Sequence, residues 1–379
     1  MEEMEKVENI EEVEEVQEVE AVDVVEQIEL VENSEKKKAL LIKLSSLGDV
    51  VFNIPLANAL KDAGYEVTWL VSERGIQVVE NNPCVDKVVL APVQKWRKRG
   101  LKFENFKEYF ALIKQLRDEK FDVAIDSQMI LKSMVWTMFC GAKRRIIAKD
   151  AREGSIIGGN EWIEKIFDKA NPIVLNYLKF ASHLDCFPSE IKVTLPPRSE
   201  MVVKKVDNLL IDVDKTKPLV VIAPATTWVA KHWNKDHWRN VVNELEDNYS
   251  LVFTGGPNDK ELIDYIRNGK HTSIAGKTDL MDLVEVFSRA RVVLAPDSGS
   301  AHLAWASRNP AVVTIFTCTP KGLLAPYGDK KKYIAVGGEG LGCQPCFRRK
   351  CTRRRNKNIC CDFPCANDVV KVVQGLKLL

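Results

Sequence analysis

The chain has 379 residues, of which 45% are hydrophobic, and a formal net charge of +2. Its length suffices for two domains of ordinary size, and its hydrophobic fraction excludes a chain that stays unfolded throughout. The near-neutral charge averages two unlike parts, because residues 1–35 hold fifteen acidic groups against Lys6 alone, which leaves +16 on the remainder. A positive remainder suits an anionic ligand or an anionic membrane surface.

The acidic segment carries valine or isoleucine at every third position from Val7 to Val31. Three residues turn a helix by about 300°, so this stripe winds around the helix and forms neither one apolar face nor a coiled-coil seam. We therefore predict that residues 1–38 form an acidic tail outside the fold, disordered or loosely helical. The tail lacks the features of a secretory signal, and no apolar run in the chain approaches the roughly 18 residues of a transmembrane helix.

Short apolar segments then alternate with helical patterns, which is typical of an α/β domain with a parallel sheet. A first domain is expected over residues 39–195, and a linker from Leu195 through Arg198 and the charged stretch after it. Its expected strands are Ala39–Ile42, Val67–Val71, Lys87–Leu90 and Val123–Asp126, and its expected helices are Pro55–Ala63 and Asn105–Glu119.

The alternation repeats over residues 196–342, followed by a cysteine-rich basic segment at 343–365 and a closing helix within 366–379. We therefore predict two Rossmann-like domains that face a central cleft. In the second domain the expected strands are Leu219–Ala223, Ser250–Thr254, Thr272–Ala275, Val292–Ala295 and Ala311–Phe316, and the expected helices are Trp238–Glu246, Lys260–Arg267, Leu280–Ser288 and Ala301–Ala306.

The stretch from Lys43 to Pro55 is the most informative part of the first domain. It places Ser45, Ser46, Gly48 and Asp49 in a strand-to-helix turn, at the sheet edge where open α/β folds bind ligands. By itself Asp49 could equally be a helix cap, because backbone N–H groups and the helix dipole stabilise a carboxylate there.

Two turns of the second domain could hold a phosphorylated nucleoside. Thr226, Thr227 and Lys231 offer hydroxyls and an ammonium suited to a phosphate, the alternative being a solvated turn. The glycine pair before Asp259 allows close backbone approach, and Asp259 could bond a ribose hydroxyl, although an ordinary turn has the same composition.

A third turn opens the helix after the strand at Val292. Ser298 and Gly299 lie where helix N–H groups can receive a diphosphate. Asp297 could orient Lys231 or bond a sugar hydroxyl, and His302, one turn further, could reach the same group. A structurally satisfied histidine is the alternative for His302.

Further polar residues in the first domain could face a second substrate. Gln128 and Lys132 are four residues apart after a strand, so we expect them on one helical face. The basic run from Lys95 to Arg99 could bind an anionic acceptor or simply form a solvated loop.

The cysteines are unevenly distributed. Cys84, Cys140, Cys186 and Cys318 are scattered and expected to be buried free thiols. The C-x2-C and C-x3-C spacings of the other six suit a structural zinc ion held by four thiolates, and free thiols in a loop are the alternative. These six are Cys343, Cys346, Cys351, Cys360, Cys361 and Cys365.

Four ordered motifs, within a match from about Leu40 to Tyr327, resemble glycosyltransferase family 9, the lipopolysaccharide heptosyltransferases, and most closely the heptosyltransferase I type. The resemblance implies a GT-B fold. The motifs are Ser45-Ser-Leu-Gly-Asp49, Asp126-x-Gln128-x3-Lys132-Ser133, Ala225-Thr-Thr227-x3-Lys231-His-Trp233 and Asp297-Ser-Gly299-x2-His302.

The resemblance implies an inverting transfer of heptose from ADP-heptose to a lipopolysaccharide inner-core acceptor, with no metal in catalysis. Asp49 matches the general base and Lys231 the charge that stabilises the leaving diphosphate. The matching donor residues are Thr226, Thr227, Lys231, Asp259, Asp297, Ser298, Gly299 and His302, and the matching acceptor residues are Ser46, Lys95, Arg97, Gln128, Lys132 and Arg152.

The acidic tail and the cysteine-rich segment depart from the best-known members of this family. A cytoplasmic protein is expected, at most peripheral to the inner membrane through its basic segment, with no nucleic-acid partner. Two alternatives stay open: a GT-B transferase that uses another nucleotide sugar, and a non-catalytic GT-B scaffold whose basic segment binds an anionic polymer or lipid. The presence of both Asp49 and Lys231 argues against the scaffold.

Overall fold

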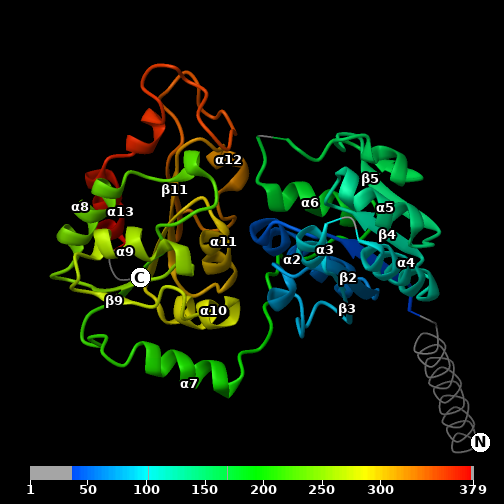
Figure 1. Ribbon diagram of the computed structural model, residues 1–379, viewed down its shortest axis with the longest axis horizontal. Coiled ribbons are helices and arrows are strands. Elements are labelled where there is room, and N and C mark those ends of the chain that lie inside the picture. Colours follow the sequence, from blue (N-terminus) through cyan, green and yellow to red (C-terminus); the bar gives the residue numbers. More distant parts are fainter. Residues whose placement is uncertain (1–35, 101, 169, 377–379) are drawn as a thin grey trace, which may run out of the picture. The chain divides into compact units, whose positions relative to one another are not determined.

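The computed structural model describes residues 36–100, 102–168 and 170–376. Residues 1–35 of the predicted tail (1–38) and the last three residues of the predicted closing helix lie outside these ranges. Lys38, which was predicted to end the tail, opens the first strand, β1 (Lys38–Ile42). Two six-stranded parallel sheets organise the described residues, each with helices beside it (Figure 1). The predicted α/β fold class is confirmed.

The first sheet has the strand order β3-β2-β1-β4-β5-β6. Its central strand is apolar and fully buried from Ala39 to Ile42, as expected of a parallel strand with both faces covered. The strands are β1 (Lys38–Ile42), β2 (Glu66–Ser72), β3 (Lys87–Ala91), β4 (Val123–Asp126), β5 (Arg144–Ala148) and β6 (Glu161–Ile163). The sequence analysis missed β5 and β6, since β5 opens with two arginines and β6 has only three residues.

The second sheet repeats this order as β9-β8-β7-β10-β11-β12. Its strands are β7 (Leu219–Ile222), β8 (Ser250–Phe253), β9 (Thr272–Ser273), β10 (Val292–Pro296), β11 (Ala311–Phe316) and β12 (Tyr333–Gly337). β12 was not predicted, and β9 is shorter than predicted.

The strand order reverses once in each sheet. In the first sheet the chain runs outward from β1 to β3 and then returns to place β4 on the other side of β1. In the second sheet β10 lies beside β7 in the same way. Ligands of open α/β sheets bind beyond the carboxyl ends of the strands at such reversals. The four sequence motifs follow these four strands.

Seven of the helices in the described residues correspond to predicted ones, and one of them, Lys260–Arg267, has the predicted bounds. Those of the first domain are α2 (Leu47–Asp62), α3 (Val93–Arg99), α4 (Phe103–Asp118), α5 (Leu131–Phe139) and α6 (Ile173–Ser182). Those that follow are α7 (Glu200–Leu209), α8 (Lys235–Leu245), α9 (Lys260–Arg267), α10 (Leu280–Arg289), α11 (Gly299–Ala306), α12 (Lys321–Leu324) and α13 (Ala366–Gly375). Short 3-10 turns are η1 (Ile76–Val78), η2 (Ser155–Gly158), η3 (Val229–Lys231), η4 (Pro257–Asp259) and η5 (Ile359–Asp362).

The prediction that the first helix begins at Pro55 is wrong. α2 begins at Leu47 and contains Pro55, so Gly48 and Asp49 lie in its first turn rather than before it. Ser46 is the N-cap, and the Asp49 carboxylate accepts a hydrogen bond from its N–H. This capping pair starts the helix eight residues before the proline.

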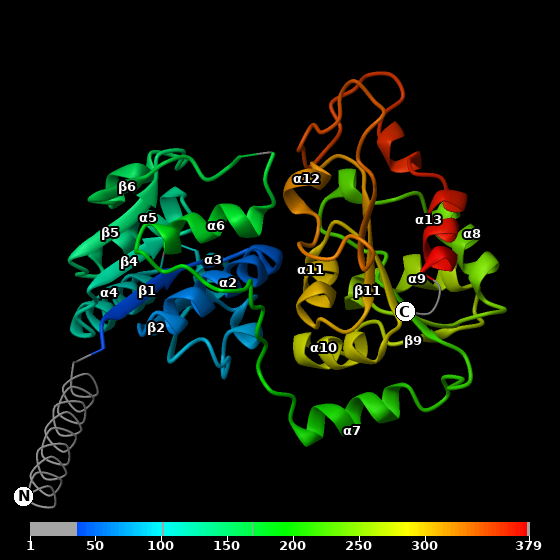
Figure 2. The ribbon, with the colours of Figure 1, turned by 180° about the vertical axis from the view of Figure 1, so that it is seen from behind.

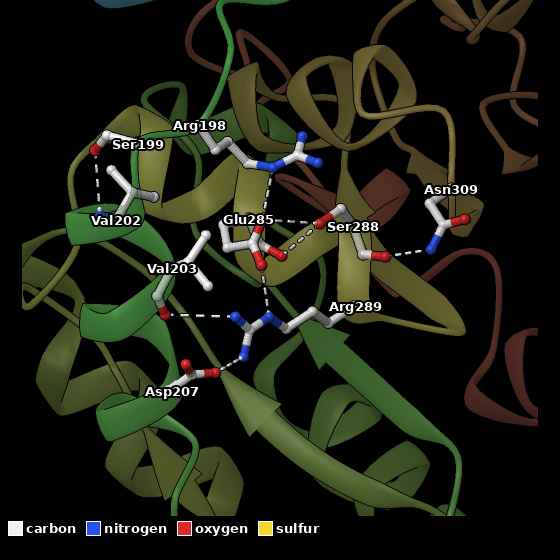
Figure 3. A network of polar contacts seen from close by, with 9 residues as sticks. All are labelled: Arg198, Ser199, Val202, Val203, Asp207, Glu285, Ser288, Arg289 and Asn309. Atoms are coloured by element: carbon white, nitrogen blue, oxygen red, sulfur yellow. Dashed lines mark hydrogen bonds and ion pairs between the residues drawn. The ribbon is translucent and has the colours of Figure 1, made fainter.

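The charged stretch after Arg198 is a helix rather than a linker. Ser199 caps α7 by accepting a hydrogen bond from Val202 N at 3.3 Å. A buried carboxylate, Glu285 on α10, accepts ion pairs from Arg198 at 2.6 Å and from Arg289 at 2.7 Å, and Arg289 also reaches Asp207 of α7 (Figure 3). These contacts fasten α7 to the second domain.

The closing helix, α13, packs along α8 in both views (Figure 2). Its buried residues Val369, Val370 and Val373 join the core formed around Trp238 of α8. The last helix therefore belongs to the packing of the second domain, and the cysteine-rich segment before it is held at both ends.

Candidate active site

Both carboxylate oxygens of Asp49 accept hydrogen bonds at the start of α2. One oxygen, Oδ2, accepts hydrogen bonds from both N and Oγ of Ser46, each at 3.0 Å. The other, Oδ1, accepts from the Tyr177 hydroxyl at 3.3 Å. Burial alone would raise the pKa of Asp49, but the nearby Lys43 ammonium and the Ser46 hydrogen bonds bring it below its usual value. The carboxylate is therefore ionised at neutral pH.

Lys43 and Tyr177 are functional candidates that the sequence analysis missed. Lys43 is 2% exposed, and its Nζ donates to Tyr177 Oη at 2.7 Å and to the Ser127 carbonyl at 2.9 Å. Burial lowers the pKa of Lys43 to about 8 and raises that of Tyr177 well above its usual value. Lys43 and Tyr177 thus place a positive charge and a hydroxyl donor beside the Asp49 carboxylate.

A second carboxylate, Asp126, shapes the loop after β4. It is fully buried and accepts four hydrogen bonds, from Gln128 N, Met129 N, Ser133 Oγ and Thr137 Oγ1, at 2.8 to 3.0 Å. Burial raises its pKa, and the four donors oppose that rise. Through these four hydrogen bonds, Asp126 holds the loop after β4 against the start of α5.

The loop brings Gln128 and Lys132 to the turn before α2. Gln128 Oε1 accepts from Leu44 N at 3.1 Å and from Ser45 N at 2.9 Å. Lys132 Nζ donates to Ser45 Oγ at 2.6 Å. The prediction that both share a helical face is wrong, because α5 starts only at Leu131 and Gln128 precedes its N-cap. They still converge on one turn.

In the second domain a buried cluster surrounds Asp297, the residue directly after β10. Asp297 is 1% exposed; its Oδ2 lies 2.6 Å from Lys231 Nζ and accepts from Thr319 Oγ1 at 2.7 Å. Its Oδ1 lies 3.2 Å from Nε2 of His302. Burial would raise the pKa of Asp297, but His302 and Lys231 hold it well below its usual range. Asp297 therefore orients both basic side chains.

Contacts between α2 and α11 bring this cluster close to Asp49. The His302 ring lies 4.4 Å from the Phe52 ring, centroid to centroid, and it also contributes to the lowered pKa of Asp49. A Cβ at Gly48 would stand 2.4 Å from His302 Cδ2, so only glycine permits this approach. Gly299 packs in turn against Leu47. His302 thus lies beside Asp297 on one side and the start of α2 on the other.

The other residues predicted to bind the nucleotide-sugar donor differ in the hydrogen bonds that they make. Thr226 and Thr227 lie in the turn after β7, and no hydrogen bond of their hydroxyls occurs within the described residues. The Ser298 hydroxyl is buried, and the described residues offer it no partner. Asp259 accepts from Gly256 N at 2.7 Å and so caps its own turn.

The predicted acceptor residues separate into two groups. Ser46, Gln128 and Lys132 belong to the Asp49 turn, and the charge of Arg152 influences the pKa of Lys43 nearby. Lys95 and Arg97 lie instead on α3, which is a helix where a loop was the alternative. Lys95 pairs with Glu108 at 2.8 Å, and Arg97 is exposed. Among the described residues, Lys95 bonds to Glu108 and, through its N–H, to Glu73 at 3.1 Å, and not to the Asp49 turn.

The cysteine-rich segment gathers its thiols around one cavity. Cys318, one of the four cysteines correctly predicted to be buried, joins them there, whereas Cys365 lies at the start of α13 with its Sγ 3.1 Å from Asp368. Among the described residues, no three histidine, cysteine, aspartate or glutamate side chains already lie together as metal ligands. The zinc ion stays a prediction. The cavity is lined by Cys318, Cys343, Cys346, Cys351 and Cys360.

Comparison with known proteins places this geometry in a family. The family model described as glycosyltransferase family 9 (heptosyltransferase) matches residues 109–356, more than half of the chain. The chain belongs to this family. It is a glycosyltransferase, and the resemblance drawn from the four motifs is confirmed.

Family 9 relatives cover most of the chain. Lipopolysaccharide heptosyltransferase 1 of Pseudomonas aeruginosa is 27% identical over 83% of this chain and 87% of its own. A family 9 glycosyltransferase from Veillonella parvula shares the fold with a TM-score of 0.74 at 17% identity, over 90% and 97% of the two chains. The E. coli heptosyltransferase WaaC with ADP-2-deoxy-2-fluoro heptose has a TM-score of 0.66 at 22% identity, over 89% and 99%. The predicted GT-B fold is thereby confirmed.

Within the part of this glycosyltransferase that the structure describes, every helix is too short or too polar to cross a membrane.

Proposed function

We propose that this glycosyltransferase moves a heptose from ADP-heptose to a lipopolysaccharide inner-core acceptor, with inversion at the anomeric carbon and without a metal ion in the reaction. The observation that carries the proposal is the position of His302, which lies beside both the ionised Asp49 carboxylate and the Lys231–Asp297 pair. The names of the Pseudomonas relative and of the ligand bound to the E. coli relative support the sugar and the nucleotide.

Asp49 would act as the general base. Its carboxylate accepts the proton of the acceptor hydroxyl as that oxygen attacks the anomeric carbon, on the face opposite the departing diphosphate. The new carbon–oxygen bond takes the electron pair of the hydroxyl oxygen, and the bond to the diphosphate breaks with its pair leaving on ADP. Attack from the opposite face inverts the anomeric configuration.

Lys231 would stabilise the leaving diphosphate. Its ammonium is held by Asp297 at 2.6 Å in a largely buried position, where a fixed positive charge acts more strongly than in water. The uncommitted hydroxyls of Thr226, Thr227 and Ser298 can donate to phosphate oxygens nearby. These charges and donors would take the place of a divalent ion.

Ser46, Gln128, Lys132 and Arg152 would receive the acceptor. Lys132 and Arg152 carry positive charge toward the turn that holds Asp49, which suits an acceptor sugar bearing a carboxylate or phosphate. Lys95 and Arg97 would contribute only through a longer acceptor, since both lie on α3 and Lys95 is held by Glu108 of α4 and by Glu73.

The decisive experiment follows ADP release from ADP-heptose in the presence of a lipopolysaccharide precursor, with and without EDTA. We expect release to persist in EDTA and to fall by about 10³-fold or more in Asp49→Asn. Asp118→Asn, which changes an exposed carboxylate on α4, is the matched control and should keep the wild-type rate. A fully active Asp49→Asn would refute the assignment of the base, and equal turnover of another nucleotide sugar would refute the donor.

The basic segment suggests where such an acceptor is presented. Seven exposed lysine and arginine side chains lie between Cys346 and Cys360, beside the half-exposed Phe347. We propose that they contact the anionic face of the inner membrane from the cytoplasmic side, since each basic residue near such a surface contributes about 1 kcal/mol. The seven are Arg348, Arg349, Lys350, Arg353, Arg354, Arg355 and Lys357.

A further inference from the structure

The cysteine-rich segment is folded against the turn that carries Lys231. Ala230 N donates to the Arg349 carbonyl at 3.3 Å, immediately before Lys231. On the other side, Asn234 N donates to the Cys361 carbonyl at 2.9 Å. The backbone on both sides of Lys231 is therefore hydrogen-bonded to a segment more than a hundred residues later in the chain.

Side chains strengthen the same contact. Trp228 lies in edge contact with Phe347, at 5.7 Å between ring centroids. The Cζ atom of Arg349 lies 5.5 Å from the centroid of the same indole ring. Lys231 Nζ lies 4.7 Å from the same indole. Trp233 Nε1 donates to the Pro364 carbonyl at 2.8 Å. A change in the cysteine-rich segment would therefore reach Lys231 through Trp228.

Ala230 lines a cavity of about 370 Å³. Five thiols line it, with neither histidine nor carboxylate among the lining residues. Such a donor set selects thiophilic metal ions over magnesium or calcium, which prefer oxygen ligands. The five are Cys318, Cys343, Cys346, Cys351 and Cys360.

The charge around the cavity suits a thiolate complex. Four thiolates around a divalent ion carry a net charge of about −2. Arg348 and Arg353 also line the cavity, and Arg353 Nη1 lies 3.5 Å from Cys343 Sγ. Cationic N–H groups beside ligating sulfur atoms are the outer-shell partners that such sites use.

The cavity is wider than an ion needs, and the described residues hold no three donors already at ligand spacing. Cys318 and Cys360 are buried, whereas Cys343 is exposed and Cys346 and Cys351 are half-buried. Thiolate–zinc bonds are about 2.3 Å long, so an ion would draw the outer thiols inward onto the two buried ones. That contraction would pull on Phe347 and Arg349, which touch Trp228.

We propose that a thiophilic divalent metal ion, zinc or iron(II), binds in this cavity through Cys318, Cys346, Cys360 and one of the two remaining thiols, and that its binding fixes the Lys231 turn for the donor nucleotide. Cys318 was not among the cysteines predicted to bind a metal, because it lies far from them along the chain. Cys361 does not line the cavity and Cys365 Sγ lies 3.1 Å from Asp368, so neither belongs to the proposed ligand set. The part concerning the donor rests on the proposed function, whereas metal binding itself does not.

Metal binding is tested on the full-length protein, purified anaerobically without added metal and analysed for zinc and iron. We expect about one equivalent in the wild type and in Cys140→Ser, whose buried thiol lies in the first domain. The double variant Cys318→Ser/Cys360→Ser should hold less than about a tenth of that. Cobalt(II) added to the stripped wild type should give the absorption of a tetrahedral thiolate complex. Absence of this spectrum, or equal metal in the double variant, would overturn the site.

Coupling to the donor side is tested by ADP affinity in the stripped and reloaded protein. We expect stripping to weaken ADP binding by about tenfold and to change the fluorescence of Trp228, with Trp228→Phe identifying its signal. Metal that binds without changing ADP affinity would overturn the coupling alone. ADP that fails to bind even the loaded protein would instead overturn the proposed function and leave the metal site standing.

Discussion

At the scale of single residues, the ionisation of Asp49 is governed by opposing effects. Its burial favours the neutral acid, whereas Lys43, the Ser46 donors and His302 favour the carboxylate, and the carboxylate prevails. Lys43 is itself buried, and its pKa falls to about 8 because burial disfavours the charged ammonium. The ammonium persists at neutral pH beside Asp49 and the Ser127 carbonyl.

This balance predicts a change in the pH profile of Lys43→Met. Because the charge that lowers the pKa of Asp49 is removed, the acid limb of kcat/KM should move to higher pH by about 1 to 2 units. Tyr177→Phe keeps the Lys43 charge, so the acid limb of this variant should shift less. Its kcat should still fall, because the hydroxyl that orients the Asp49 carboxylate is lost. The measurement is kcat/KM from pH 4 to 9.

One control variant accompanies this profile. Lys143→Met removes an exposed ammonium that pairs with Asp122, and it should leave the limb in place. His302 and Lys132 also act on Asp49 or its turn and are unchanged in both variants. An unmoved acid limb in a folded Lys43→Met protein would show that Lys43 does not set the ionisation of Asp49.

At the scale of elements, the site depends on the contact of α2 with α11. The first turns of these two helices carry Asp49 and the Gly299–His302 segment, and Leu47 packs directly on Gly299. Phe52, one turn further along α2, contacts both His302 and Trp305. The position of His302 is thus set by helix packing and not by its own turn alone.

Gly48→Ala tests this packing, because its Cβ would collide with the His302 ring. Overpacking of this kind should lower the free energy of unfolding by about 1 to 3 kcal/mol. The double variant Gly48→Ala/His302→Ala should recover most of that loss, since the obstacle is gone. Urea unfolding of the two single variants and the double variant gives the interaction energy.

Gly342→Ala is the matched control, since no atom lies within 4 Å of the position of its Cβ. It should change the free energy of unfolding by less than about 0.5 kcal/mol. A Gly48→Ala protein as stable as the wild type would mean that His302 can withdraw freely from α2.

At the scale of the whole molecule, one strand order used twice explains where the functional residues lie. Each sheet reverses its order once, and the turns after β1 and β4 and after β7 and β10 meet at these reversals. Seven exposed lysine and arginine side chains lie on the cysteine-rich segment, which is hydrogen-bonded to the backbone on both sides of Lys231. The proposed membrane contact and the proposed donor site thus lie in neighbouring parts of the second domain.

The exposed charge predicts binding to anionic lipid vesicles that weakens as salt rises. Arg354→Gln/Arg355→Gln/Lys357→Gln should reduce this binding at least about tenfold, because three surface cations are lost. These residues do not line the thiol cavity. Vesicle sedimentation with and without anionic lipid measures the effect.

The matched control is Lys95→Gln/Arg97→Gln/Lys98→Gln, which removes as much charge from α3. It should leave vesicle binding close to the wild-type value. Equal loss in both triple variants would mean that net charge, rather than the cysteine-rich segment, drives the binding.

Much of this arrangement could be predicted from the sequence, because local patterns report local structure. Apolar runs located most of the strands, and the residues directly after them marked the sheet edges where Asp49, Lys231 and Asp297 lie. Errors arose where a local pattern was ambiguous. Pro55 suggested a helix start although the Ser46–Asp49 pair had already begun the helix, and the spacing of Gln128 and Lys132 suggested a helical face where a turn lies.

The sequence by itself determined the fold class, the family and the order of the four motifs, since these depend on periodicity and on residues close together in the chain. The tertiary structure decided which distant residues touch. Tyr177 reaches Asp49 across 128 positions, Lys43 meets Ser127 at the reversal of the first sheet, and Cys318 joins the later cysteines around their cavity. No periodicity records such neighbours, because helix packing and strand order bring them together only when the whole chain folds.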